Sequence, residues 1–405
     1  MTSTLPTPFH YRGNIADVLF ARRYWFIAAL FVGLALRAGV FAYAWQWPIS
    51  NEHGATVSPG TVQTSTDFAT YIKAANILRS FSVETFIGAI EEPVRGDADM
   101  YLRNFIQPLL PGLILATGYG PGNTLPLSLV FLGVSCIAFV IWLVILRRTQ
   151  LPGYWLLGFA LLPTPLWFAV NMTLDSLLAV SVAVFYFLYF YGQNINGRVI
   201  FLTISVIAMI ITRSNGAFII GFLLADVVLF QKLKPHKLIT ALGSLLLIGV
   251  LLALLFLPLF AFEVSKAAVM PGLFGISNDE WLSGVFGSLP TALDRPLSWL
   301  SFAGAKILYF CGLRPSFGNT VGVELLVRAA PGLIMVPGII YLIFSSEARH
   351  RLFFLCYFLP FFGHLPQDRY SLAIQPLLFM FGAQFFESLR SRTASALHHR
   401  KASSS

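Results

Sequence analysis

The chain has 405 residues, of which 57% are hydrophobic and only 11% are charged, and its formal net charge is +9. A soluble protein of this length needs more charged side chains than this to cover its surface. The composition therefore excludes a large soluble core and predicts an all-α, polytopic membrane protein. The basic residues form no stripe interleaved with aromatic rings, which argues against a nucleic-acid partner. The three cysteines are scattered without a CxxC spacing, so neither a disulfide framework nor a zinc site is expected.

We interpret ten apolar segments as spans of a bilayer core of about 30 Å. The first follows Arg22 and Arg23 and is too long for a signal-peptide core, so we interpret it as an uncleaved span. Two shorter apolar pieces, 105–119 and 297–313, are expected to be juxtamembrane helices on the outer side; if both cross instead, the count becomes twelve. The predicted spans are 24–46, 125–146, 152–170, 175–192, 199–212, 215–231, 238–262, 329–346, 351–365 and 370–388.

With a cytoplasmic N-terminus, most lysines and arginines of the short loops and tails fall on the cytoplasmic side, as the positive-inside rule requires. Residues 1–405 are then one transmembrane domain with two long external loops, 47–124 and 263–328, and a basic cytoplasmic tail, 390–405, that we expect to be disordered. Seven of the eighteen acidic residues lie between Trp47 and Arg103. Long structured loops usually carry function, so the candidate site is expected in the first loop.

Within that loop, Asp67 begins a predicted amphipathic helix, and Tyr71 falls one turn later on the same face, followed by Lys73. The plain alternative is that Thr66 or Asp67 only caps this helix, where a carboxylate suits the N-terminal dipole. Further on, two acids, an aromatic residue and a base precede a proline-broken apolar helix; these are Asp97, Asp99, Tyr101 and Arg103, followed by Gln107 to Gly112.

Polar residues at the mouths of later spans form a second group of candidates. Asp175 follows Asn171, Met172 and Thr173 at the start of a span, and Arg213 with Ser214, Asn215 and Gly216 separates two others. Charges at such positions are costly unless they have a partner or a role. Near the C-terminus, His364, Arg369 and Tyr370 precede the Gln375-Pro376 pair.

Arg37 lies in the middle of the first span, where an unpaired cation costs at least about 2.5 kcal/mol. Two interpretations stay open: a structural ion pair inside the bundle, or a contact to the phosphate of a bound lipid.

Taken together, these landmarks resemble the GT-C glycosyltransferases, polytopic enzymes that take sugar from a polyprenyl-phosphate carrier. Asp67 with Tyr71 is similar to that family's loop-one aspartate motif, and Gln107 to Gly112 to the proline-rich stretch of the aminoarabinose and protein O-mannosyl transferases. Asp175 and the Arg369-Tyr370 pair are similar to the acid that opens a later span and to the terminal Arg-Tyr element. The chain departs from the aminoarabinose-transferase pattern at Gln107, where a lysine is expected, and its prolines are split.

The resemblance implies a multi-pass enzyme of a bacterial inner membrane, with a site facing the periplasm that moves a sugar from a polyprenyl-phosphate donor to a lipid, glycan or protein acceptor. Asp67 is then the candidate general base, because the acceptor hydroxyl must lose its proton as it attacks. Asp175, Asp97 and Asp99 would orient the acceptor or bind a divalent ion, Mg²⁺ or Mn²⁺, although no spacing requires a metal. Cations for the donor phosphate are Arg369, Arg103, Lys73 and Arg314, and candidate substrate contacts are Tyr71, Tyr101, Tyr370 and His364.

Each of those cations has a plain alternative as an interfacial anchor that reaches lipid headgroups. Two other functions also fit the sequence. A flippase or transporter of a lipid-linked or anionic glycan intermediate would use the same outer cavity without breaking a bond, and a polysaccharide polymerase or ligase would keep the carrier chemistry with another donor and acceptor. A transporter usually shows helices broken by Gly or Pro at mid-membrane.

Overall fold

The structure is a computed structural model that describes residues 15–46, 66–79, 107, 109–117, 124–149, 151–167, 169, 172–231, 243, 307–308, 310–311, 313, 330–358 and 371–403. This described part is all helical and contains no strand, as the sequence predicts. Its helices are α1 (Ile15–Gln46), α2 (Thr66–Arg79), α5 (Leu109–Ala116), α6 (Leu125–Arg148), α7 (Tyr154–Ala160), α8 (Pro163–Trp167), α9 (Leu174–Tyr186) with a π-helical turn η3 (Phe187–Tyr191), α10 (Arg198–Thr212), the 3-10 turn η4 (Ser214–Ala217), α11 (Phe218–Leu229), α16 (Gly332–Ser345), α17 (Ala348–Phe358) and α19 (Gln375–Ser403).

Within the described ranges, three helical segments are long and apolar enough to cross a membrane: Arg23–Gln46, Leu125–Arg148 and Leu174–Tyr191. They correspond to the predicted spans 24–46, 125–146 and 175–192, and they indicate a membrane protein. The predicted span 238–262 and most of the two long loops lie outside the described residues. Shorter apolar helices, α10, α11 and α16, occupy three further predicted segments.

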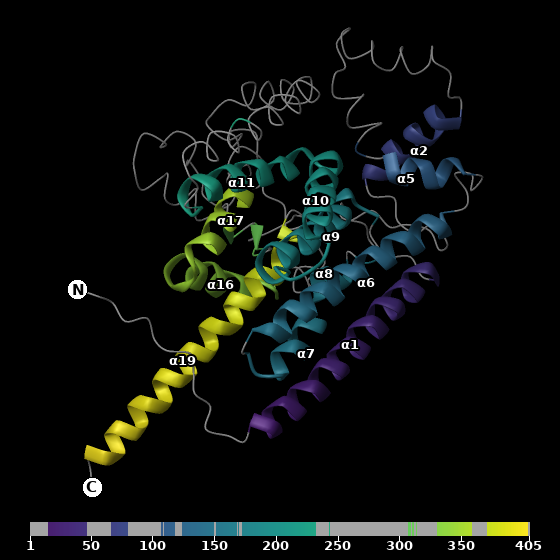
Figure 1. Ribbon diagram of the computed structural model, residues 1–405. Helices are drawn as coiled ribbons and strands as arrows, with labels where there is room; N and C mark the ends of the chain where they lie inside the picture. Colours follow the sequence, from purple (N-terminus) through teal and green to yellow (C-terminus); the bar gives the residue numbers. More distant parts are fainter. Residues whose placement is uncertain are drawn as a thin grey trace, which may run out of the picture.

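The helices α1 and α6 lie side by side along one edge of the bundle (Figure 1). Large apolar side chains such as Phe31, Tyr43 and Ile137 are exposed on them, as expected for surfaces that face lipid. The two helices approach closely at Gly33, because a Cβ there would lie only 2.1 Å from the ring of Phe139. A glycine at this position therefore allows an aromatic ring of α6 to pack directly on the backbone of α1.

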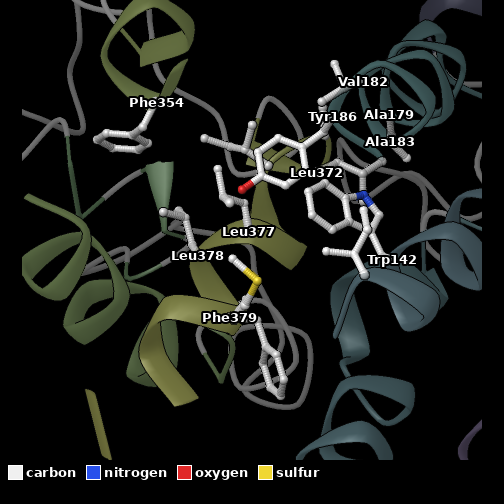
Figure 2. Close-up of a cluster of buried hydrophobic side chains, with 14 of the residues drawn as sticks. Trp142, Ala179, Val182, Ala183, Tyr186, Phe354, Leu372, Leu377, Leu378 and Phe379 are labelled. Atoms are coloured by element: carbon white, nitrogen blue, oxygen red, sulfur yellow. The ribbon is translucent and has the colours of Figure 1, made fainter. Parts of the chain in front are cut away.

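One large apolar core joins α6, α9, α17 and α19. Figure 2 shows Trp142 of α6 beside Tyr186 of α9, with Leu377 and Leu378 of α19 nearby. The Trp142 and Tyr186 ring centroids are 5.0 Å apart, and both side chains are fully buried. Aromatic packing of this kind holds segments that are far apart in sequence at fixed positions.

The segment 152–170 is not the continuous span that its hydropathy predicts. It forms two short helices, α7 and α8, with a break at Leu161 and Leu162. The physical reason is Pro163: proline disfavours helical geometry in the residue before it, so α7 ends and a new helix starts with the proline in its first turn.

The helix α19 continues to Ser403 (Figure 1), through most of the segment 390–405 for which the sequence predicts a disordered tail. No proline or glycine follows Gly382, so a helix already nucleated by its packed first half is free to continue. That first half packs against α16.

Candidate functional site

A buried ion pair lies where α9 begins and α10 ends. Arg213 Nη2 is 2.8 Å from Asp175 Oδ2, and the two side chains are only 13% and 2% exposed. Asp175 is in the first turn of α9, after an extended Thr173, and Arg213 is the extended residue that follows α10. Since α9 and α10 are antiparallel neighbours, the start of one meets the end of the other, and the pair offsets the cost of burying each charge.

The turn after Arg213 depends on Gly216. A Cβ at this glycine would lie 2.0 Å from the carbonyl oxygen of Met209, so only glycine permits η4 to fold back against the last turn of α10. Tyr357, near the end of α17, lies within electrostatic range of both Asp175 and Arg213. Three helices thus converge on this pair, at what we call the Asp175 end of the bundle.

The helix α2 is attached to the same end through Tyr71. Its buried hydroxyl donates a 2.8 Å hydrogen bond to the carbonyl oxygen of Met172, three residues before Asp175. Its ring stacks on Phe131 of α6, with 6.2 Å between centroids. The sequence motif that contains Asp67 and Tyr71 therefore packs beside the Asp175 segment, although about a hundred residues separate them in the chain.

The helix α5 forms a compact pair with α2. Arg79, at the end of α2, donates to the carbonyl oxygens of Leu115 and Ala116, at 2.5 and 3.5 Å, where the C-terminus of α5 would otherwise leave them unpaired. A Cβ at Gly112 would lie 2.7 Å from the Cβ of Ala74, so the two helices touch backbone to side chain. This short, partly exposed helix lies within the piece 105–119 for which we predict a juxtamembrane helix.

Of the predicted site residues, the structure brings Tyr71 and Asp175 together. Asp67 lies in the first turn of α2, which is compatible with both a cap and a site residue, and the side chains of Asp67 and Lys73 are not described. The remaining candidates lie outside the described residues: Asp97, Asp99, Tyr101, Arg103, Arg314, His364, Arg369 and Tyr370. In the described part, no group of three or more His, Cys, Asp or Glu residues could hold a metal ion.

The sequence marks Arg213 as a polar residue at the mouth of a span, but the cations predicted for the donor phosphate do not include it. Its signal in the sequence is a cation directly after an apolar helix, followed by Ser-Asn-Gly, and this pattern is equally typical of a helix-end anchor. Only the fold shows that its guanidinium turns inward onto a carboxylate. A buried carboxylate beside a guanidinium offers an acceptor for a hydroxyl proton and a cation for a phosphate oxygen within one small region.

Arg37 lies in a second polar position, between α1 and α6. It is 2% exposed, its guanidinium lies 4.1 Å above the ring of Phe139, and it donates to the carbonyl oxygen of Gly33 at 3.0 Å and to Ser135 Oγ at 3.3 Å. No carboxylate of the described residues pairs with it, so the predicted structural ion pair is not found in that part of the chain.

A cavity of about 40 Å³ adjoins Arg37. Its lining combines Arg37 and two serines with apolar and aromatic residues, and it extends to Ser176, the residue after Asp175. The cavity therefore lies just inside the Asp175 end. The lining residues are Arg37, Ser135, Ala138, Phe139, Trp142, Phe159, Pro165, Ser176, Ala179, Leu372 and Pro376.

The opposite end of α9 and α10 carries a second buried acid, Asp226. It accepts hydrogen bonds from Tyr189 at 2.6 Å and Gln231 at 3.0 Å, and Arg349 Nε is 3.0 Å from its other oxygen. Arg198 donates to the carbonyl oxygens of Leu188 and Tyr189 in the π-helical turn. These contacts join four elements, so we interpret the Asp226 end as structural.

Comparison of the chain with protein-family models, with curated proteins and with solved structures finds no match. The resemblance to GT-C enzymes therefore depends on the sequence landmarks, and the geometry of the Asp175 end is independent of it.

Proposed function

We propose that this protein is a membrane glycosyltransferase that moves a sugar from a polyprenyl-phosphate donor to an acceptor at the Asp175 end of the bundle. The observation that carries the proposal is the convergence of the α2–α5 pair on the Asp175–Arg213 ion pair through the Tyr71 hydrogen bond. This convergence joins two of the sequence landmarks that suggest the reaction, the Asp67–Tyr71 motif and Asp175. It also adds a cation, Arg213, beside the acid.

The chemistry follows from the residue types. The acceptor hydroxyl attacks the anomeric carbon, its proton passes to a carboxylate, and the bond from that carbon to the carrier phosphate breaks, leaving negative charge on the phosphate. Asp67 is our candidate for the base, and Asp175 orients the acceptor. Cations nearby stabilise the leaving phosphate. Full topology, with ten spans in a bacterial inner membrane and this end facing the periplasm, is part of the proposal.

A flippase or transporter for a lipid-linked or anionic glycan intermediate is the second candidate, and specific features of the structure favour it. The break between α7 and α8 and the cation at Arg37 are features of transporters, and Phe159 and Pro165 from either side of the break line the Arg37 cavity. Both functions bind the same lipid phosphate, and only the first cleaves the sugar bond.

The test is sugar transfer from a panel of radiolabelled polyprenyl-phosphate sugars to added acceptors by purified protein in nanodiscs. We expect turnover by the wild type and a loss of about 10²-fold or more in Asp67→Asn and Asp175→Asn. Asp226→Asn is the matched control, because it neutralises an equally buried acid at the other end of the bundle and should keep its turnover.

Thermal unfolding of each variant separates a chemical effect from misfolding. Equal losses in Asp175→Asn and Asp226→Asn would contradict a site at the Asp175 end. Absence of turnover with every donor, together with movement of the intact lipid-linked sugar across the bilayer of a proteoliposome, would replace the transferase with the transporter.

A further inference from the structure

Arg37 is a cation buried inside the bundle with few partners of its own. A guanidinium carries five N–H donors and keeps its charge in proteins. Of the described residues, only the Gly33 carbonyl and the Ser135 hydroxyl accept hydrogen bonds from it, and the Ser135 contact is long at 3.3 Å. Both acceptors are neutral. The positive charge of Arg37 therefore remains available to an anionic ligand.

The position of this guanidinium is held by packing. Gly33 admits the ring of Phe139 against the backbone of α1, and Phe139 in turn stacks on Phe159 of α7 with 5.6 Å between centroids. The guanidinium lies on this fixed ring, where the attraction between cation and ring keeps it in place. Such support from neighbouring side chains is what a preorganised binding site requires.

Among the described residues, the cavity beside Arg37 has donors but no acid in its lining. Besides Arg37, it is lined by Ser135, whose hydroxyl donates to no described residue, and by Trp142, whose indole N–H has no acceptor among the described residues. A lining with N–H and O–H donors and without carboxylates suits an anion and repels no negative charge.

The size of the cavity limits the occupant. About 40 Å³ holds roughly three water-sized groups, at about 10 to 15 Å³ each. That is enough for the terminal oxygens of one phosphate group. The helix α1 lies at the edge of the bundle and exposes large apolar side chains, so a phosphate carried on a membrane lipid is one candidate occupant.

We propose that Arg37, Ser135 and Trp142 form an anion site that binds one phosphate group inside the bundle. The site goes beyond the transfer reaction, because a lipid phosphate would bind there whether or not a sugar is transferred. The phosphate could come from a lipid headgroup or from free phosphate, and the test distinguishes these sources.

The experiment measures binding to purified protein in detergent by the ligand-dependent shift of the unfolding temperature. The probes are a polyprenyl monophosphate, the matching neutral polyprenol, and inorganic phosphate. The variants are Arg37→Gln, Arg37→Lys, Ser135→Ala and the control Arg23→Gln, which removes an exposed arginine of the same helix.

We expect the polyprenyl phosphate to stabilise the wild type and Arg23→Gln, with an affinity at least about tenfold weaker in Arg37→Gln, and the polyprenol to have no specific effect. Stabilisation by inorganic phosphate that Arg37→Gln abolishes would identify free phosphate as the ligand. Equal affinities of wild type and Arg37→Gln, or no response to either phosphate, would overturn the site. If Arg37→Gln does not fold, Arg37→Lys and Ser135→Ala decide: unchanged affinity in both contradicts the proposal.

The binding experiment and the transfer assay can refute the anion site and the proposed transferase separately. Phosphate binding that depends on Arg37, without any sugar transfer, would retain the anion site and reject the transferase. Sugar transfer and phosphate affinity that are both unchanged in Arg37→Gln would retain the transferase and reject the anion site.

Discussion

Three buried charged positions of this protein are satisfied in different ways. Asp175 has the guanidinium of Arg213, Asp226 has two hydrogen-bond donors and Arg349, and Arg37 has a ring, a carbonyl oxygen and a hydroxyl. Removing one partner of a buried ion pair leaves the other charge uncompensated. Removing a cation that has no carboxylate partner leaves no uncompensated charge behind. The three positions should therefore respond differently to substitution.

Arg213→Met should lower the free energy of unfolding by about 3 to 5 kcal/mol, because Asp175 then remains charged in a buried position. Asp175→Asn in the same protein should recover most of that loss, since it removes the uncompensated charge. Chemical unfolding of the two single variants and the double variant measures the coupling. Additive losses would mean that the ion pair contributes nothing to stability beyond its separate residues.

Arg37→Met is expected to leave the unfolding temperature of the ligand-free protein unchanged or raised, because a similar apolar volume replaces a buried cation. The same variant should lose the stabilisation by polyprenyl phosphate. A residue kept at a cost in stability is typical of a functional position. A marked drop in the unfolding temperature would show instead that the contacts to Phe139 and Gly33 are structural.

At the scale of helices, glycines determine where two axes can approach. A Cβ at Gly338 of α16 would lie 2.0 Å from the carbonyl oxygen of Leu378, and one at Gly382 of α19 would lie 2.3 Å from that of Ile334. Two small residues facing each other across a crossing are a common feature of helix pairs in membranes.

Gly338→Ala and Gly382→Ala should each destabilise the protein by about 1 to 3 kcal/mol, because backbone atoms would have to move apart. Gly221→Ala, with nothing within 4 Å of its added methyl group, is the matched control and should be neutral or slightly stabilising. Unfolding in denaturant compares the three. A loss in Gly221→Ala of equal size would attribute the effect to glycine removal in general.

The contact of α5 with α2 can be tested separately from the rest of the bundle. Gly112→Val should push α5 away from Ala74 and so loosen α2, which carries Asp67. We expect faster limited proteolysis within 66–117 and reduced transfer, with little change in global unfolding. Gly133→Val on α6, where a Cβ meets nothing within 4 Å, should change neither. Unchanged proteolysis in Gly112→Val would mean that the two helices are held by other contacts.

Hydropathy predicts the long helices of this protein better than the short ones. It correctly predicts three helices that are long and apolar enough to cross a membrane, α1, α6 and α9 with η3, because a continuous apolar run of that length has few alternatives. It misses the break at Pro163, since hydropathy ignores backbone geometry.

The candidate site was predictable from the sequence only in part. The acids at Asp67 and Asp175 and the ring of Tyr71 are visible as polar positions in an apolar sequence. The pairing of Asp175 with Arg213 is not, because it depends on the antiparallel packing of α9 and α10 and on the turn that Gly216 permits. Contacts between distant segments are set by the fold and leave no local pattern.

Across the whole molecule, the Asp175 end and the basic segment of α19 together suggest one orientation in the membrane. The Asp175 end carries the α2–α5 pair, whereas α19 extends from the bundle with a basic segment that includes Arg390 and Arg392 (Figure 1). By the positive-inside rule, we expect the α19 segment in the cytoplasm and the Asp175 end outside.

Cysteine labelling in intact cells tests this orientation directly. In a background with Cys136, Cys311 and Cys356 replaced by alanine, Thr117→Cys beside α5 should react with a membrane-impermeant maleimide added from outside, because Thr117 is exposed at the Asp175 end. Thr393→Cys, exposed on α19, should react only after the membrane is opened. Labelling of both from the same side would show that an even number of spans separates them, rather than the nine predicted. The reverse pattern would move the Asp175 end, and the proposed transfer, into the cytoplasm.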